Sequence, residues 1–117
     1  PLVIALASGA NFIARGFSGD PNGTAELIAQ AIRHPGFSFV EILSPCVTFR
    51  PEQKQWKEQV RAAPVQHTDD AGLAARRLMT DDGFNLGVLY AGQRNPYPAR
   101  GASAAASVAD LETEFEL

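Results

Sequence analysis

The segment from residue 11 to residue 43 constrains the fold most, because it reads as strand, helix and strand in immediate succession. Asn11–Phe17 is short, aromatic and β-branched, which is typical of a buried strand. Asp20 can cap a following helix and Pro21 suits its first position. Phe37–Leu43 is mostly apolar on both parities, which predicts a second strand with both faces covered.

Between these strands, apolar residues recur at helical spacing and predict a helix from Pro21 to about Arg33. His34, Pro35 and Gly36 end it, because the residue before a proline disfavours α geometry. Strand, helix and strand in this order form a unit expected to be a right-handed parallel crossover. The chain is therefore predicted to be an α/β protein.

The remaining pattern is less regular. We expect a short buried helix ending at Gly9, a polar and partly helical surface segment over Arg50–Ala63, and a helix from Thr68 to near Gly83. Leu86–Tyr90 predicts a short last strand. Residues 101–117 read as a small-residue linker and an acidic tail, expected to be flexible. Two or three strands with so few helices suggest an incomplete parallel sheet.

Composition excludes several classes of protein. The 117 residues are 45% hydrophobic, too apolar for a disordered chain. A net charge of −3 gives no basic field, so we expect neither a nucleic-acid nor a membrane partner. The longest apolar run, Pro1–Ala7, is too short to span a bilayer. A single cysteine allows no intrachain disulfide and no cysteine-built zinc finger within this chain.

Cys46 is the candidate functional residue. It follows directly on the Phe37–Leu43 strand, at the edge where ligands bind in open α/β sheets. A lone cysteine there is most simply a small buried hydrophobe. A nucleophilic thiol would need a base, and the only histidines are His34 and His67. As a metal ligand, Cys46 would need its companion thiolates from elsewhere in the protein.

Other candidates have simpler structural readings. The loop from Arg15 to Asp20 lacks the glycine pattern of a phosphate-binding loop, and its acid would repel a phosphate. His34 is interpreted as ending its helix and His67 as a solvent-exposed residue. The acidic residues of the last third are interpreted as charges flanking a helix (Asp69, Asp70, Asp81 and Asp82).

Two strings carry a family resemblance. Gly9-Ala10-Asn11-Phe12-Ile13-Ala14-Arg15 and Ser44-Pro45-Cys46-Val47-Thr48-Phe49, together with the segments around them, resemble the carboxy-terminal part of the β subunit of 2-oxoacid:ferredoxin oxidoreductases. The resemblance covers residues 1–49 well and resumes weakly over residues 85–97. It implies the fold of a thiamine-diphosphate-binding sheet fragment with flanking helices and an extended tail. Implied boundaries are 1–50 for that sheet, 51–100 for a carboxy-terminal extension and 101–117 for the tail.

The resemblance also implies a function. Enzymes of this family decarboxylate a 2-oxoacid, of the 2-oxoglutarate or pyruvate type, on thiamine diphosphate with Mg²⁺. The acyl group passes to coenzyme A, and electrons pass through a 4Fe–4S cluster to ferredoxin. Cys46 matches the family's fourth cluster cysteine, and four thiolates hold such a cluster. The implied partners are the α subunit, ferredoxin, the 2-oxoacid and coenzyme A, in the cytoplasm.

The sequence departs from the family where it lacks the other three cluster cysteines and the Gly-Asp-Gly-Asp pyrophosphate motif. We therefore expect a fragment that is inactive alone, holds no cofactor in isolation and can self-associate through exposed strand edges. The alternative is a stand-alone, non-catalytic α/β interaction module derived from such a subunit, with Cys46 buried and inert. A weaker alternative is a thiol enzyme using Cys46. The sequence identifies no catalytic or thiamine-contacting residue.

Overall fold

The structure is a computed structural model that describes residues 1–93. The helices are α1 (Leu2–Ala7), α2 (Pro21–Arg33), α3 (Trp56–Gln59) and α4 (Ala71–Thr80), with a 3₁₀ turn, η1 (Pro51–Gln55), before α3. The strands are β1 (Phe12–Phe17), β2 (Ser38–Leu43), β3 (Arg61–Ala62) and β4 (Asn85–Ala91). The weaker match over residues 85–97 lies partly outside the described residues, and the predicted tail at 101–117 lies wholly outside them.

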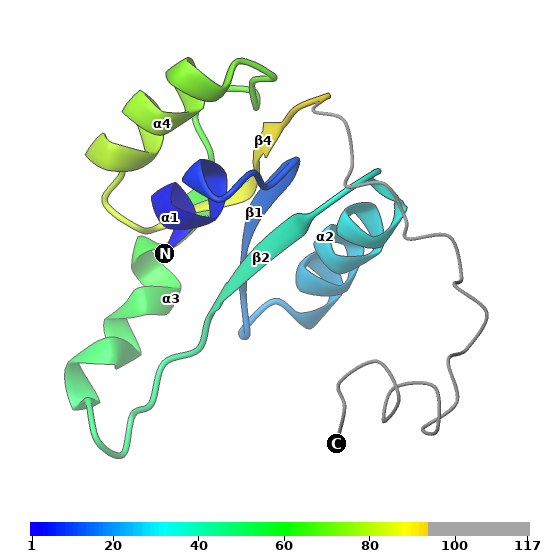
Figure 1. The fold of residues 1–117 in the computed structure, drawn as a ribbon. Helices are drawn as coiled ribbons and strands as arrows, with labels where there is room; N and C mark the ends of the chain where they lie inside the picture. Colours follow the sequence, from blue (N-terminus) through cyan, green and yellow to red (C-terminus); the bar gives the residue numbers. More distant parts are fainter. Residues whose placement is uncertain (94–117) are drawn as a thin grey trace, which may run out of the picture.

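The described strands form one sheet in the order β2-β1-β4-β3. β1 and β2 pair in parallel through the helix α2, as the strand–helix–strand pattern predicts. β3 and β4 also pair in parallel, with α4 between them in the sequence, and so form a second strand–helix–strand unit. The two units meet where β4 pairs antiparallel with β1 (Figure 1). The α/β class is confirmed, and the sheet is mostly parallel, with β4 antiparallel to β1 as the one departure among the described strands.

The direction of β4 could not be predicted from the sequence, and the reason is physical. The pattern of Leu86–Tyr90 indicates an extended segment, but an apolar strand reads the same in either direction. The direction of β4 depends on the end of the sheet at which the chain arrives after it leaves β2. The segment between β2 and β4 contains the short β3, which no sequence signal indicated, and the helix α4. After these two elements the chain enters β4, which pairs with β1 on the side that β2 does not occupy.

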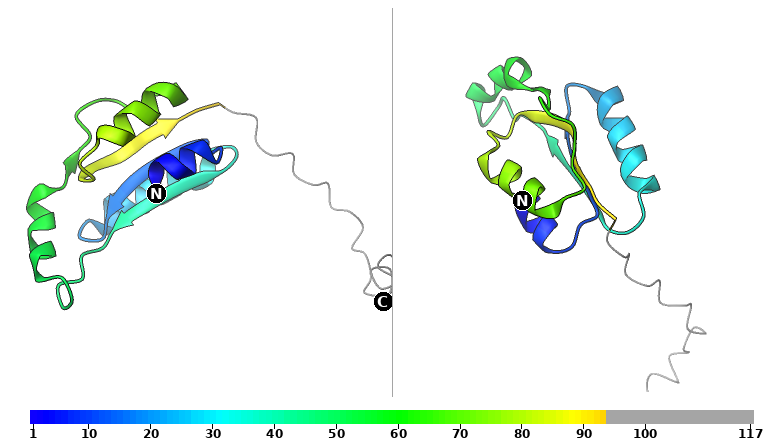
Figure 2. Two further views of the ribbon diagram at one scale, coloured as in Figure 1. Left: turned by 60° about the vertical axis from the view of Figure 1, so that its left-hand side comes forward. Right: turned by 90° about the horizontal axis from the view of Figure 1, so that it is seen from above.

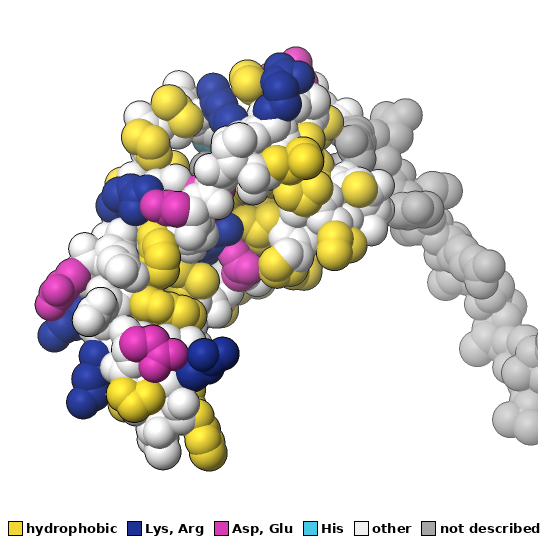
Figure 3. Space-filling model, turned by 90° about the vertical axis from the view of Figure 1, so that its left-hand side faces the viewer, with side chains coloured by type: hydrophobic (Ala, Val, Ile, Leu, Met, Phe, Trp, Pro, Cys, Tyr) yellow, Lys and Arg dark blue, Asp and Glu magenta, His cyan; other side chains and the backbone are white. Residues whose placement is uncertain are grey.

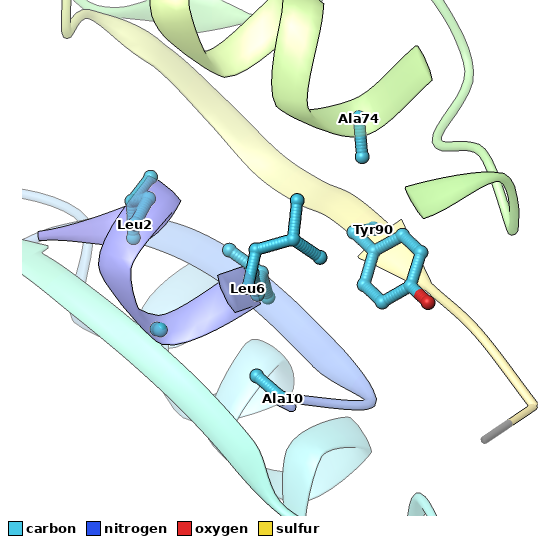
Figure 4. Close-up of a cluster of buried hydrophobic side chains, with 7 residues drawn as sticks. Leu2, Leu6, Ala10, Ala74 and Tyr90 are labelled. Carbon is cyan, nitrogen blue, oxygen red and sulfur yellow. The ribbon is translucent and has the colours of Figure 1, made fainter. Parts of the chain in front are cut away.

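Helices cover both faces of the sheet, as Figure 2 shows from two sides. On one face α1 and α4 pack over β1 and β4, where Leu2, Leu6, Ala10, Ala74 and Tyr90 point toward one another (Figure 4). On the other face α2 packs on a second apolar cluster that includes Phe12, Ala14 and Ala31. Successive residues of β1 therefore belong to clusters on opposite faces of the sheet, Ile13 to the first and Phe12 and Ala14 to the second, as expected for a strand covered on both faces.

Helix ends follow the expected signals. Asp20 caps α2 by accepting a hydrogen bond from the Gly23 N–H at 3.0 Å. Asp70 caps α4 in the same way, accepting from the Leu73 N–H at 2.8 Å. No helix among the described residues is long and apolar enough to cross a membrane.

Candidate functional site

Cys46 lies in the loop that leaves the carboxyl end of β2. β1 and β2 end side by side, because the Ser18 N–H donates to the Leu43 carbonyl at 2.9 Å. The chain then runs away from the sheet toward η1 and α3 (Figure 1). Cys46 is therefore positioned at the predicted edge, on a segment that extends beyond the sheet.

Two hydrogen bonds shape the backbone around Cys46. Its N–H donates to Oε1 of Gln53 at 2.7 Å, and its carbonyl accepts from the Arg50 N–H at 2.8 Å. The Cys46 residue is nevertheless exposed. The interpretation of Cys46 as a buried hydrophobe is therefore wrong, because the loop leaves the sheet before any helix covers it.

Hydrophobic side chains accompany the exposed thiol. Phe49 is 85% exposed and Val47 is 46% exposed, although neither carries a polar group that would favour water. Hydrophobic side chains reach the surface at several places on the face shown in Figure 3. The loop thus presents one sulfur beside two exposed hydrophobic side chains, and residues 44–50 contain no other Cys, His, Asp or Glu that could join it as a metal ligand.

The structure does not bring either histidine to Cys46. His34 lies at the other end of the sheet, by the start of β1, where its Nε2 is 3.0 Å from the Gly92 carbonyl and its ring is 5.3 Å from that of Phe12. His67, exposed as expected, lines the same surface hollow as His34. Within residues 1–93 no three His, Cys, Asp or Glu side chains are grouped to hold a metal ion. The described part therefore places neither histidine beside the Cys46 sulfur as the base that a thiol enzyme would need.

A buried charge cluster lies between β1, β2 and the end of α4. Arg15 Nε donates to Glu41 at 2.6 Å, and its Nη1 donates to a carboxylate oxygen of Asp81. Nη1 also donates to the Asn85 carbonyl at 3.3 Å. Burial opposes the charged guanidinium, but the hydrogen bonds to Asp81 and Glu41 outweigh it and raise the pKa of Arg15.

Asp81 is held by further donors. It accepts from the Gly83 N–H at 3.0 Å and from Nδ2 of Asn85 at 2.5 Å. Its side chain is only 8% exposed. Asp81 does flank α4, as interpreted, but it is also part of a buried cluster that this interpretation did not include. Its neighbour Asp82 lies at the surface, paired with Arg61 at 2.6 Å.

Sequence reasoning missed this cluster, although one signal was available. Arg15 and Glu41 each interrupt an otherwise apolar strand, and the parallel register places them directly opposite each other. A charged residue inside a buried strand requires a partner. The third member, Asp81, lies 66 residues from Arg15 in the chain and gives no comparable signal.

The predicted family resemblance is confirmed by comparison with curated proteins, although no protein-family model matches the sequence. The β subunit of 2-oxoacid:ferredoxin oxidoreductase 2 from Aeropyrum pernix is 32% identical over 77% of this chain and 34% of its own length. A β subunit from a Sulfolobus species is 37% identical over 50% of this chain and 20% of its own length.

A solved structure gives the same relationship in three dimensions. The 2-oxoglutarate:ferredoxin oxidoreductase of Magnetococcus marinus, with 2-oxoglutarate, coenzyme A and succinyl-CoA bound, superposes with a TM-score of 0.70 at 33% identity. The match covers 82% of this chain and 34% of that one. The chain thus spans at most about a third of the length of these relatives. None of these similarities favours the alternative of a stand-alone module, and the exposed Cys46 contradicts the buried cysteine it assumed.

Proposed function

We propose that this chain serves as part of the β subunit of a 2-oxoacid:ferredoxin oxidoreductase. The reaction is the oxidative decarboxylation of a 2-oxoacid to an acyl-CoA, with ferredoxin as electron acceptor. The observation that carries the proposal is the agreement of sequence and fold with such enzymes over about four fifths of this chain. The Magnetococcus structure, which holds 2-oxoglutarate and succinyl-CoA, supports a substrate of the 2-oxoacid class.

Within that enzyme we assign Cys46 as one thiolate ligand of a 4Fe–4S cluster. Its exposed position lets the sulfur reach a group held mainly by other parts of a longer subunit. The donor type fits, since four thiolates hold such clusters, and the described residues supply no competing metal site. When bound, the cluster would carry electrons from the decarboxylation toward ferredoxin.

The residues around Cys46 have supporting roles in this proposal. The hydrogen bond from the Cys46 N–H to Gln53 fixes the direction in which the loop leaves β2. The exposed side chains of Val47 and Phe49 would cover the cluster from water, and burial of a cluster influences its reduction potential. Thiamine diphosphate and Mg²⁺ belong to the same proposal, but we assign no residue of this chain to them.

The test uses a chimera in which the full 117-residue chain replaces the matching region of the Aeropyrum β subunit, assembled with its partner subunits. We expect reduction of a viologen dye that depends on both a 2-oxoacid and coenzyme A, with 2-oxoglutarate and pyruvate compared as substrates. The isolated chain should show no such activity. Activity of the isolated chain would overturn its assignment as a part of the enzyme.

A pair of loop variants tests the role of Cys46. Cys46→Ser should remove the cluster's visible absorption and its paramagnetic resonance signal from the chimera, and with them dye reduction. Thr48→Ala, an exposed change in the same loop, should retain both. A full cluster signal in the Cys46→Ser chimera would refute the ligand assignment and leave the family assignment intact.

A further inference from the structure

β2 is an edge strand whose outer side is open in the described part of the chain. It is the first strand in the order β2-β1-β4-β3, and residues 1–93 provide no strand on its far side. Natural edge strands are protected by outward charges, prolines or bulges. β2 has an unbroken register with β1 and contains no proline. Its one charged residue, Glu41, is held by Arg15 rather than guarding the edge.

Apolar side chains flank this edge on the face covered by α1. Ile4 of α1 is 72% exposed, and Phe37, the residue before β2, is 42% exposed. Together with Pro1 and Phe39 they line a shallow, largely apolar hollow. α1 and β2 lie side by side in both views of Figure 2. An exposed apolar hollow next to an open strand edge is typical of a surface that another element covers.

The other face repeats the arrangement through α2. Ala31 of α2 is buried against the sheet, and Ile28 and Ile32 lie to one side of it around the helix. The opposite flank of α2, marked by Gln30, lines a hollow with Val88 of β4. Ile28 and the 79% exposed Ile32 are therefore turned toward β2 rather than toward β4.

Ile42 completes this set within β2 itself. It is 44% exposed and lies on the α2 face, because Ser38 and Val40 at the same parity contact α2 and its cluster. We define the β2 rim as the open edge of β2 with the exposed side chains on its two faces (Ile4, Phe37, Ile28, Ile32 and Ile42).

We propose that the β2 rim is where the remainder of a 2-oxoacid:ferredoxin oxidoreductase β subunit packs, with a hydrophobic strand pairing along β2. The inference rests on the proposed function. Relatives of matching sequence and fold are about three times the matched length, so two thirds of such a subunit has no counterpart here. In such a subunit part of that length would pack against this unit. Within residues 1–93 the β2 rim combines an open strand edge with apolar side chains on both faces.

The test compares the isolated 117-residue chain with the Aeropyrum chimera by hydrogen exchange. Amides of β2 that point away from β1 should exchange at least tenfold more slowly in the chimera. Ile42→Lys should lower the melting temperature of the chimera but not that of the isolated chain. Met79→Lys, an equally drastic change at an exposed residue of α4, should produce no such difference between the two.

Three results would overturn the proposal. The first is equal exchange of the β2 amides in the two proteins, and the second is a chimera that does not fold. The third is protection of β2 in the isolated chain that grows with protein concentration, which would assign the β2 rim to a second copy. A folded chimera with protected β2 but without enzyme activity would instead refute the proposed function alone.

Discussion

Replacing Arg15 with methionine removes the cation of the buried cluster and keeps most of its hydrophobic stem. The side chains of Arg15 and Asp81 are 7% and 8% exposed, and that of Glu41 is 20% exposed. Breaking a buried ion pair by removing one partner costs about 3–5 kcal/mol, because the remaining charge stays desolvated. Here two carboxylates lose one cation, and we expect a loss of about 4 kcal/mol.

Urea unfolding followed by circular dichroism measures this loss. With a slope of about 1.5 kcal/mol/M, the unfolding midpoint should fall by roughly 2.7 M. Arg61→Met, which breaks an exposed pair with Asp82, is the matched control and should shift the midpoint far less.

A charge-free variant separates electrostatics from packing. Arg15→Met combined with Glu41→Gln and Asp81→Asn leaves no unpaired charge in the cluster and should recover a large part of the lost stability. The reasoning is refuted if Arg15→Met costs no more than Arg61→Met, or if the triple variant is no more stable than Arg15→Met alone.

Three further predictions concern packing, backbone conformation and pH. Ile13→Ala, at a fully buried site, should cost about 3 kcal/mol in urea unfolding, whereas Met79→Ala at an exposed one should cost little; equal losses would contradict the core assignment. Gly36→Ala should cost more than Gly83→Ala, because both have positive φ but only at Gly36 would the new Cβ clash with a neighbouring side chain; the reverse order would be inconsistent with this geometry. The Leu73 N–H lowers the pKa of Asp70, so the resulting stability is present above the unfolded pKa of about 3.9 and lost as pH falls through the lower folded value. Asp70→Asn should flatten the acid limb of stability against pH, and an unchanged limb would exclude this contribution.

The candidate site was predictable in position but not in environment. Pro45 and Cys46 follow an apolar strand that precedes a polar segment, which is enough to place the thiol at the carboxyl end of β2. Whether it is buried depends on what packs over the loop, and residues 44–50 run outward to η1 instead of beneath a helix. The ligand role of Cys46 stays a prediction that the chimera tests.

The sequence by itself determined the local elements, because their signals lie within a few residues of one another. Asp20 and Pro21 start α2, Pro35 follows its end, and runs of β-branched and aromatic residues mark β1 and β2. The same patterns determined the parallel pairing of these strands, since a helix of this length between two strands requires a crossover.

Only the tertiary structure decided how the second half of the described chain joins the first. The antiparallel pairing of β4 with β1 depends on the path of more than forty residues after β2 and not on any local pattern. The same pairing brings Asp81 and Asn85 within hydrogen-bonding distance of Arg15. Direction along a strand and partnership across a long loop are properties of the whole packing, because apolar periodicity reports which face is buried but not against what.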